Sequence, residues 1–204
     1  MGDDRYVMKS GLVEQSSNDW VNKLYERSRS ETKMVPNLFK VMANAPEVLQ
    51  TYLDAYTMFS QSSGFTAKEQ QIIFLIISYE NGCDYCLAAH STVADFTAKL
   101  DPAITDAIRN DLAIPDEKYR ILADFTREML WTRGRPSAEK VEEFLLAGYT
   151  EKQILDIVLA ISAKTLSNYT NHLFNTPVDP VFKAREFKLV QFATRVFQLF
   201  SPKK

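Results

Sequence analysis

Apolar residues recur along most of this chain at the three- and four-residue spacing of amphipathic α-helices. The stretch Ile72–Ile77, IIFLII, is apolar on every side, which predicts a helix buried at the centre of a core. Thr66 and Glu69 form a T-x-x-E capping box that opens this helix at Ala67. No segment alternates with period two over the length of a strand. The pattern therefore predicts an all-α fold.

Capping residues, prolines and glycines divide the chain into about eight to ten helices. Pro36 and Pro46, for example, each suit the first position of a helix. The expected helices are Ser16–Ser30, a short one after Pro36, Pro46–Gln61, Ala67–Tyr79, Cys83–Lys99, Pro102–Asn110, Asp116–Arg133, Ala138–Ala147, Glu151–Leu173 and Glu186–Phe200, with a further helix start at Asp179-Pro180.

Two helix starts resemble each other, TAKEQQIIF from Thr66 and TEKQILDIV from Thr150. Each begins with a capping box and runs into an apolar helix, and a histidine follows later in each case. We expect a duplicated helical unit whose second copy lacks cysteines, within one helical domain that assembles as an oligomer. Its organisation is expected to be an N-terminal helical extension over residues 1–33, the main domain over 34–180 and a C-terminal helix over 181–204.

Composition narrows the classes of function. The chain has 204 residues, a net charge of -2 and a pI near 5.8, so nothing in its charge favours nucleic acid or an anionic membrane. No apolar run reaches membrane-spanning length, and the N-terminus lacks the core of a signal peptide. We expect a cytoplasmic protein that binds neither nucleic acid nor a membrane. In that compartment a C-x-x-C pair cycles or binds metal rather than cross-linking the fold.

Both cysteines and one of the two histidines lie close together, within the stretch Ser78–Ser91. An Asn-Gly pair can end the preceding helix, which places Cys83 in the first turn of the next one. At about 100° per residue, Cys83, Cys86 and His90 then share an arc of roughly 60° on one helix face. Two thiols beside an imidazole suit redox chemistry. The helix start favours ionisation of Cys83 and the histidine favours that of Cys86, so both assignments stay open.

The stretch from Glu80, ENGCDYCLAAHS, resembles the active-site signature of the alkylhydroperoxidase D-like branch of the carboxymuconolactone decarboxylase family. VPNLFKVMANAPEVL from Val35 and KTLSNYTNH from Lys164 resemble the segments on either side of it in longer members. The resemblance covers roughly residues 34 to 180. It implies an all-helical fold assembled as a trimer or a hexamer. It also implies a cysteine-based antioxidant activity on organic hydroperoxides or disulfides.

The resemblance also implies roles for individual residues. Cys86 matches the cysteine that attacks the peroxide, Cys83 the partner that forms the disulfide and meets the electron donor, and His90 the histidine of the proton relay. The glutamate of that relay falls at Gln71, whose amide cannot carry a proton, so we expect Glu80 to take its place. The expected enzyme is a thiol-dependent hydroperoxide reductase without cofactor or metal, reset by a thioredoxin- or lipoyl-type dithiol.

Two other readings stay open at this point. Cys83, Cys86, His90 and His172 are ligand types that suit a four-coordinate zinc site, although the histidines lack the short spacing of a zinc finger. Alternatively, the dithiol is a redox sensor whose disulfide alters assembly without sustained turnover.

Overall fold

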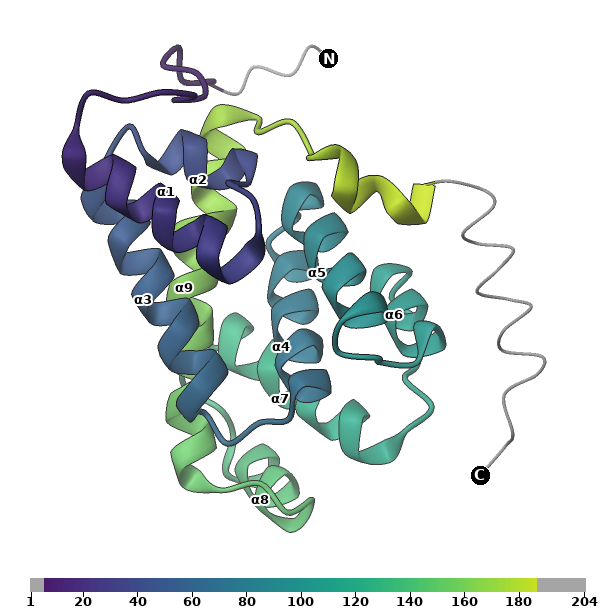
Figure 1. Cartoon of the computed structure of the whole chain (residues 1–204). Helices are drawn as coiled ribbons and strands as arrows, with labels where there is room; N and C mark the ends of the chain where they lie inside the picture. Colours follow the sequence, from purple (N-terminus) through teal and green to yellow (C-terminus); the bar gives the residue numbers. More distant parts are fainter. Residues whose placement is uncertain (1–5, 187–204) are drawn as a thin grey trace.

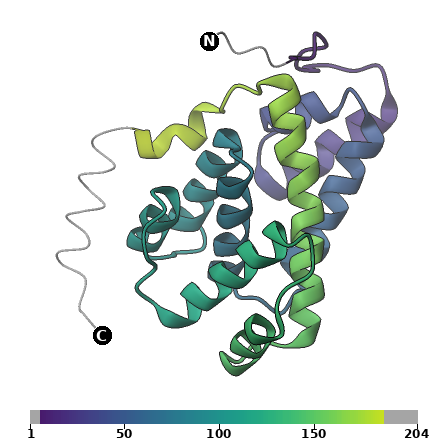
Figure 2. The ribbon, with the colours of Figure 1, turned by 180° about the vertical axis from the view of Figure 1, so that it is seen from behind.

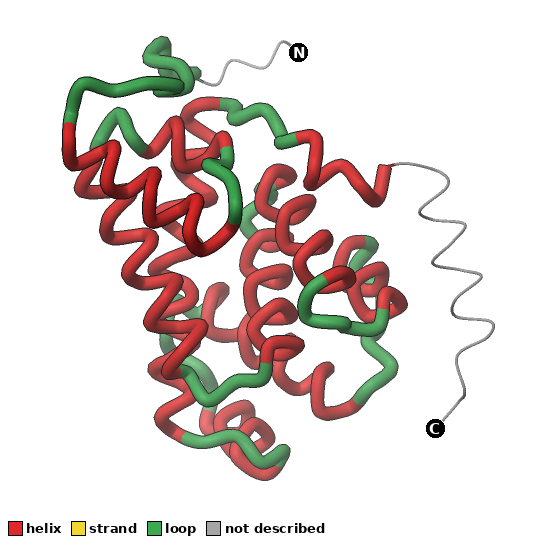
Figure 3. Tube along the Cα trace, viewed as in Figure 1, coloured by secondary structure: helices red, strands yellow, loops and turns green. Residues whose placement is uncertain are grey.

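A computed structural model describes residues 6–186, and this part of the chain is a bundle of helices without a strand (Figures 1 and 3). The helices are α1 Asp19–Thr32, α2 Asn37–Met42, α3 Pro46–Ser62, α4 Ala67–Glu80, α5 Asp84–Phe96, α6 Pro102–Arg109, α7 Glu117–Trp131, α8 Ala138–Leu146 and α9 Glu151–Phe174, followed by the 3-10 helix η1 Pro180–Glu186. The all-α prediction is confirmed. The expected helix Glu186–Phe200 lies almost entirely outside the described residues. Within 6–186 no helix is both long and apolar enough to cross a membrane.

Helix α4 is the axis of the larger core. All six side chains of Ile72–Ile77 are fully buried, because α5, α6, α7 and α9 cover the helix on all sides. The predicted capping box is present: the Thr66 hydroxyl accepts from the Glu69 amide, and the Glu69 carboxylate accepts from the Thr66 amide at 2.8 Å. The box satisfies backbone N–H groups that the buried start of α4 would otherwise leave without partners.

A tight turn joins α4 to α5 and sets the position of the first cysteine. Gly82 has a φ of +63°, a conformation that glycine adopts at little cost. Cys83 is the N-cap of α5, one residue earlier than the first-turn position predicted for it. Its amide donates to the carbonyl of Ser78 at 2.9 Å, which holds the cysteine against the end of α4. The two helices therefore pack side by side, with the thiols next to the turn.

A second apolar cluster lies between the N-terminal helices, α5 and α9, and it contains both cysteines. Helix α1 packs on α3, and α2 and α3 pack on α9, which runs along the whole molecule in Figure 2. The buried members of this cluster are Val21, Leu24, Tyr25, Leu38, Phe39, Val41, Met42, Ala43, Leu49, Tyr52, Leu53, Cys83, Tyr85 and Cys86. Helix α1 thus contributes to the core around the thiols, and the division of the chain at residues 33 and 180 stays a prediction.

The internal resemblance is visible only at the helix starts. Thr150 and Gln153 form the second predicted capping box, at the start of α9. Helix α4, by contrast, ends at Glu80 and gives way to α5 after a turn, whereas α9 continues unbroken to Phe174. The duplication of a helical unit stays a prediction.

A buried polar network ties α2 and α5 to the segment before η1. Helix α2 has no capping side chain of its own, and the Asp179 carboxylate accepts from the Asn37 amide at 3.1 Å. The Tyr85 hydroxyl donates to Asp179 and accepts from the Leu38 amide at 3.2 Å. Burial and the neighbouring Asp179 raise the pKa of Tyr85 above its ordinary value, so the phenol stays a donor. The network therefore holds α2, the start of α5 and the segment before η1 together around Cys86.

Replacing Tyr85 by phenylalanine should destabilise the protein. The substitution keeps the ring but leaves a buried carboxylate and a buried backbone amide short of a partner, which costs about 1–3 kcal/mol of unfolding free energy. Urea unfolding followed by circular dichroism measures this change. Tyr6→Phe, at an exposed tyrosine, is the matched control and should leave the curve unchanged. Equal stability of Tyr85→Phe and the unmodified protein would contradict the structural role of this network.

Candidate active site

The two sulfur atoms lie together at the start of α5, buried and unbridged. Cys83 and Cys86 are both free thiols and each is 2 % exposed. From α9, the Asn171 amide nitrogen donates to the Cys86 sulfur at 3.2 Å and lies 3.8 Å from the Cys83 sulfur. The Cys83 thiol is hydrogen-bonded to the Cys86 sulfur as well. These hydrogen bonds stabilise a negative charge on the Cys86 sulfur.

The surroundings of the two thiols lower the pKa of Cys86 and raise that of Cys83. Burial opposes ionisation of Cys86, but the hydrogen bond from Cys83 and the positive charge of Lys164 outweigh it and hold the Cys86 pKa well below its ordinary value. The pKa of Cys83 is raised, because it gives its hydrogen bond to Cys86 and is itself buried. These surroundings favour loss of the first proton of the pair from Cys86.

Lys164 is the charged group of the site, and the sequence analysis did not single it out as a site residue. It is fully buried on α9, its ammonium has no hydrogen-bond partner among the described residues, and it lies 5.7 Å above the ring of Phe74. Lysine is almost never fully buried without a partner. The signal for it was present in the sequence, since Lys164 continues the apolar stripe of Ile157 and Ala160 at helical spacing.

His90 and Gln71 meet, as the family pattern implies for the histidine and its relay partner. The Nδ1 atom of His90 lies 2.9 Å from Oε1 of Gln71, and the imidazole packs on Phe74 with ring centroids 4.8 Å apart. An amide oxygen only accepts, so Nδ1 carries the proton and Nε2 presents a lone pair. Burial, followed by the charge of Lys164, holds the His90 pKa well below its ordinary value, so the ring is neutral.

Glu80 lies close to the cysteines in sequence but is held by α7. One carboxylate oxygen accepts from Nε of Arg127 at 2.9 Å, and the other accepts from the Trp131 indole at 3.0 Å. The tight turn after α4 separates this side chain from the thiols that follow it. The structure brings Cys83, Cys86 and His90 together with Lys164, and it places Glu80 at the junction of α4 and α7.

The four residues expected for a zinc site are not assembled. His172 lies on the exposed side of α9, where its ring stacks on that of Tyr169 at 6.3 Å. Among residues 6–186, no three histidine, cysteine or carboxylate side chains converge as metal ligands.

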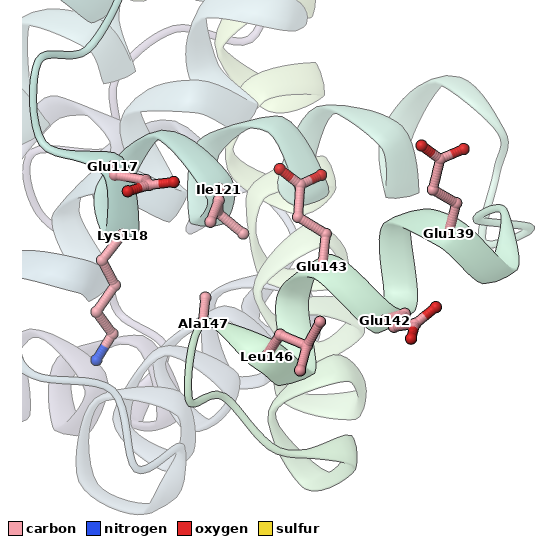
Figure 4. Close-up of a pocket in the computed structure, with 8 residues that line it drawn as sticks. All are labelled: Glu117, Lys118, Ile121, Glu139, Glu142, Glu143, Leu146 and Ala147. Carbon is pink, nitrogen blue, oxygen red and sulfur yellow. The ribbon is translucent and has the colours of Figure 1, made fainter.

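A surface cavity of about 560 Å³ lies elsewhere, between α7 and α8 (Figure 4). It is lined by Glu117, Lys118, Ile121, Glu139, Glu142, Glu143, Leu146 and Ala147. Figure 4 shows its carboxylates spread along the two helices rather than converging on one point. The cavity includes none of the dithiol residues.

No family model and no curated protein matches this sequence, but solved structures share its fold. One is the alkylhydroperoxidase AhpD core of an uncharacterized peroxidase-related protein from Ralstonia eutropha JMP134, with a TM-score of 0.73 and 20 % identity over 82 % of this chain and 89 % of that one. Another is an uncharacterized peroxidase-related protein from Silicibacter sp. TM1040, with a TM-score of 0.72 and 20 % identity over 88 % and 97 % of the two chains.

A third neighbour carries a different activity. A cysteine-to-alanine variant of the debrominase Bmp8, in complex with 2,3,4-tribromopyrrole, has a TM-score of 0.70 and 14 % identity over 92 % of this chain and 99 % of that one. The chain therefore has the fold of the alkylhydroperoxidase D core, which confirms at the level of the fold the resemblance seen in the sequence. This fold also serves more than one reaction.

Ultraviolet titration should identify Cys86 as the more acidic thiol. The absorbance of the reduced protein near 240 nm rises as thiolate forms, and the first step is expected well below the pH of about 8.5 at which a free cysteine titrates. Cys86→Ser should remove this step. Cys83→Ala should keep it but move it to higher pH, because a hydrogen bond to the sulfur is lost. A low step that survives in Cys86→Ser and disappears in Cys83→Ala would reverse the assignment.

Proposed function

We propose that this protein is a thiol-dependent hydroperoxide reductase that works through a Cys83/Cys86 dithiol–disulfide cycle. The observation that carries the proposal is the pair of buried free thiols at the start of α5, with the Asn171 amide donating to the Cys86 sulfur at 3.2 Å. The peroxidase-related names of two structural neighbours support the same class of reaction.

In the first step, the Cys86 thiolate attacks the outer oxygen of the hydroperoxide. A sulfur–oxygen bond forms, the oxygen–oxygen bond breaks, and the alkoxide leaves with a proton as the alcohol, so Cys86 becomes a sulfenic acid. The Cys83 thiol then attacks the Cys86 sulfur, which forms the disulfide and releases water. Neutral His90, with the lone pair of Nε2 free of Gln71, is the base that assists ionisation of Cys83.

The cycle is closed by an external dithiol of the thioredoxin or lipoyl type. Such a donor supplies two electrons and two protons by thiol–disulfide exchange. In this scheme Glu80 acts through Arg127, holding the end of α4 and the turn that carries Cys83.

The lining of the site favours an organic rather than a small inorganic peroxide. Aromatic and aliphatic side chains surround the thiols, among them Phe39 and Tyr52, whose rings contact edge to face at 5.8 Å. An apolar group on the substrate gains free energy by leaving water for such a lining.

Reductive debromination is a second candidate. The likeness to a debrominase with a bound bromopyrrole favours it, as do the aromatic rings beside Cys86. The same dithiol balances this reaction, since its two electrons convert a carbon–bromine bond into a carbon–hydrogen bond and bromide, leaving the disulfide.

We further propose that the chain forms a homo-oligomer through the outer face of α9. Leu155, Val158, Tyr169 and Leu173 are between 42 % and 70 % exposed and share one face of this helix, opposite the face that carries Lys164. Exposed apolar side chains gathered on one face of a helix are typical of a protein interface. The trimer or hexamer implied by the family resemblance would bury it.

Turnover separates these functions. With dihydrolipoamide or a thioredoxin system as reductant, the protein should consume cumene hydroperoxide over many cycles, and Cys86→Ser should abolish this. Cys83→Ser should be oxidised once, leaving a sulfenic acid on Cys86 that dimedone traps and mass spectrometry detects. Oxidation of one equivalent of the thiol pair, without sustained turnover under any reductant, would point to a redox sensor. Turnover of tribromopyrrole without turnover of peroxide would favour the second candidate.

Leu155→Glu combined with Tyr169→Glu should reduce the oligomer to monomers, because two charges would be buried in the proposed interface. Sedimentation velocity measures the mass of the assembly directly. Leu112→Glu, at an exposed leucine outside α9, is the control and should leave the mass unchanged. A mutant that keeps the mass of the unmodified assembly would place the interface elsewhere.

A further inference from the structure

Lys164 is buried in a setting that offers its charge one anionic partner. The titratable groups on which its charge acts are Cys83, Cys86 and His90. His90 is neutral and the pKa of Cys83 is raised above its ordinary value, so neither balances a cation. An isolated buried charge is strongly unfavourable. The thiolate of Cys86 is the group that compensates it.

The polar atoms near Lys164 lie on one inner face of α9. Lys164, Ser167, Asn168 and Asn171 follow one another at helical spacing, and all four are buried. Asn171 donates to the Cys86 sulfur, while the Asn168 amide nitrogen and the Lys164 ammonium have no hydrogen-bond partner among the described residues. The Lys164 ammonium, whose positive charge acts on the Cys86 sulfur, is placed to donate to an oxygen atom that becomes negative during the reaction.

We propose that Lys164 is both the counter-ion of the Cys86 thiolate and the acid that protonates the departing oxygen. It would then do the work of the relay carboxylate, whose place is taken by Gln71. Gln71 has no proton to give, and the Nδ1 proton of His90 is already bonded to it. The proposal deepens the peroxidase function, and its second half rests on that function.

The proton balance of this scheme keeps the buried site neutral at every stage. Before reaction, a thiolate faces an ammonium. As the oxygen–oxygen bond breaks, the alkoxide takes a proton from Lys164, leaving an alcohol, a sulfenic acid and a neutral amine. The Cys83 thiol then condenses with the sulfenic acid and releases water. The oxidised site holds a disulfide and a neutral amine. If Lys164 kept its proton, an uncompensated cation would be buried beside an uncharged disulfide.

The first test measures the thiolate and needs no peroxide. In Lys164→Met, which preserves length and suits an apolar pocket, the 240 nm step of Cys86 should move up by at least one pH unit, a tenfold loss of thiolate at pH values below the step. Lys164→Arg should retain most of the low-pH thiolate. Lys152→Met, at an exposed lysine of the same helix, should behave as the unmodified protein. An unchanged step in folded Lys164→Met would overturn the counter-ion role.

The second test counts protons. Equilibration of the unmodified protein with a dithiol buffer, at pH values above the 240 nm step where Cys86 is a thiolate, should show that two protons accompany the two electrons of disulfide reduction, one reaching Cys83 and the other Lys164. Uptake of one proton would mean that Lys164 stays charged in the oxidised state, which overturns its role as the acid. This measurement uses the unmodified chain, so it decides that role even if Lys164→Met does not fold.

The two proposals fail in different ways. A shifted thiolate step and two-proton reduction, in a protein that does not consume hydroperoxides, would uphold the counter-ion and remove the peroxidase function. Peroxide turnover that is equally fast, with the same pH profile, in the unmodified protein and in Lys164→Met would uphold the peroxidase function and remove the role of the lysine.

Discussion

The central part of helix α4 is apolar on every side and must be buried all round, and the arrangement of the other helices follows from this constraint. Its six central residues are fully buried, so α5, α6, α7 and α9 must all pack against it. Because α5 leaves α4 through a tight turn at Gly82, the two cysteines are delivered to the edge of this core. Because α9 covers another side of α4, the face that carries Lys164 and Asn171 reaches the same place. The site is assembled by the burial of one helix.

Depth of burial decides the chemistry of the dithiol as much as the residue types do. In water, a lysine and an amide would change the acidity of a nearby thiol only slightly, because solvent screens their charge and competes for their hydrogen bonds. Cys86 is 2 % exposed, Lys164 0 % and Asn171 4 %, so water competes little with the action of the lysine and the amide on this thiol. The same burial leaves His90 neutral and keeps the Cys83 proton in place. One thiol is therefore the more acidic of the pair, and the other keeps its proton.

The features that could be predicted from the sequence are those that depend on residues a few positions apart in the chain. Both capping boxes, the buried helix after Ala67 and the shared position of Cys83, Cys86 and His90 at the start of one helix follow from local spacing, and the structure has all of them. It could not assign the more acidic thiol, because Lys164 and Asn171 come from a helix about eighty residues later in the chain. Glu80 shows the converse: closeness in sequence favoured it as a relay group, yet the turn after α4 leaves it with α7.

The charge balance of the buried site, with Lys164 included, explains why an uncharged amide suits position 71. A carboxylate beside His90 would add a second negative charge to a dry pocket that already holds a thiolate, and it would compete with Cys86 for the single ammonium. Glutamine keeps the hydrogen bond that fixes the imidazole tautomer and adds no charge. A site with thiolate, lysine and amide is neutral, and so is one with two thiols and a carboxylic acid. An uncharged side chain at position 71 therefore fits the proposed scheme, in which Lys164 holds the proton.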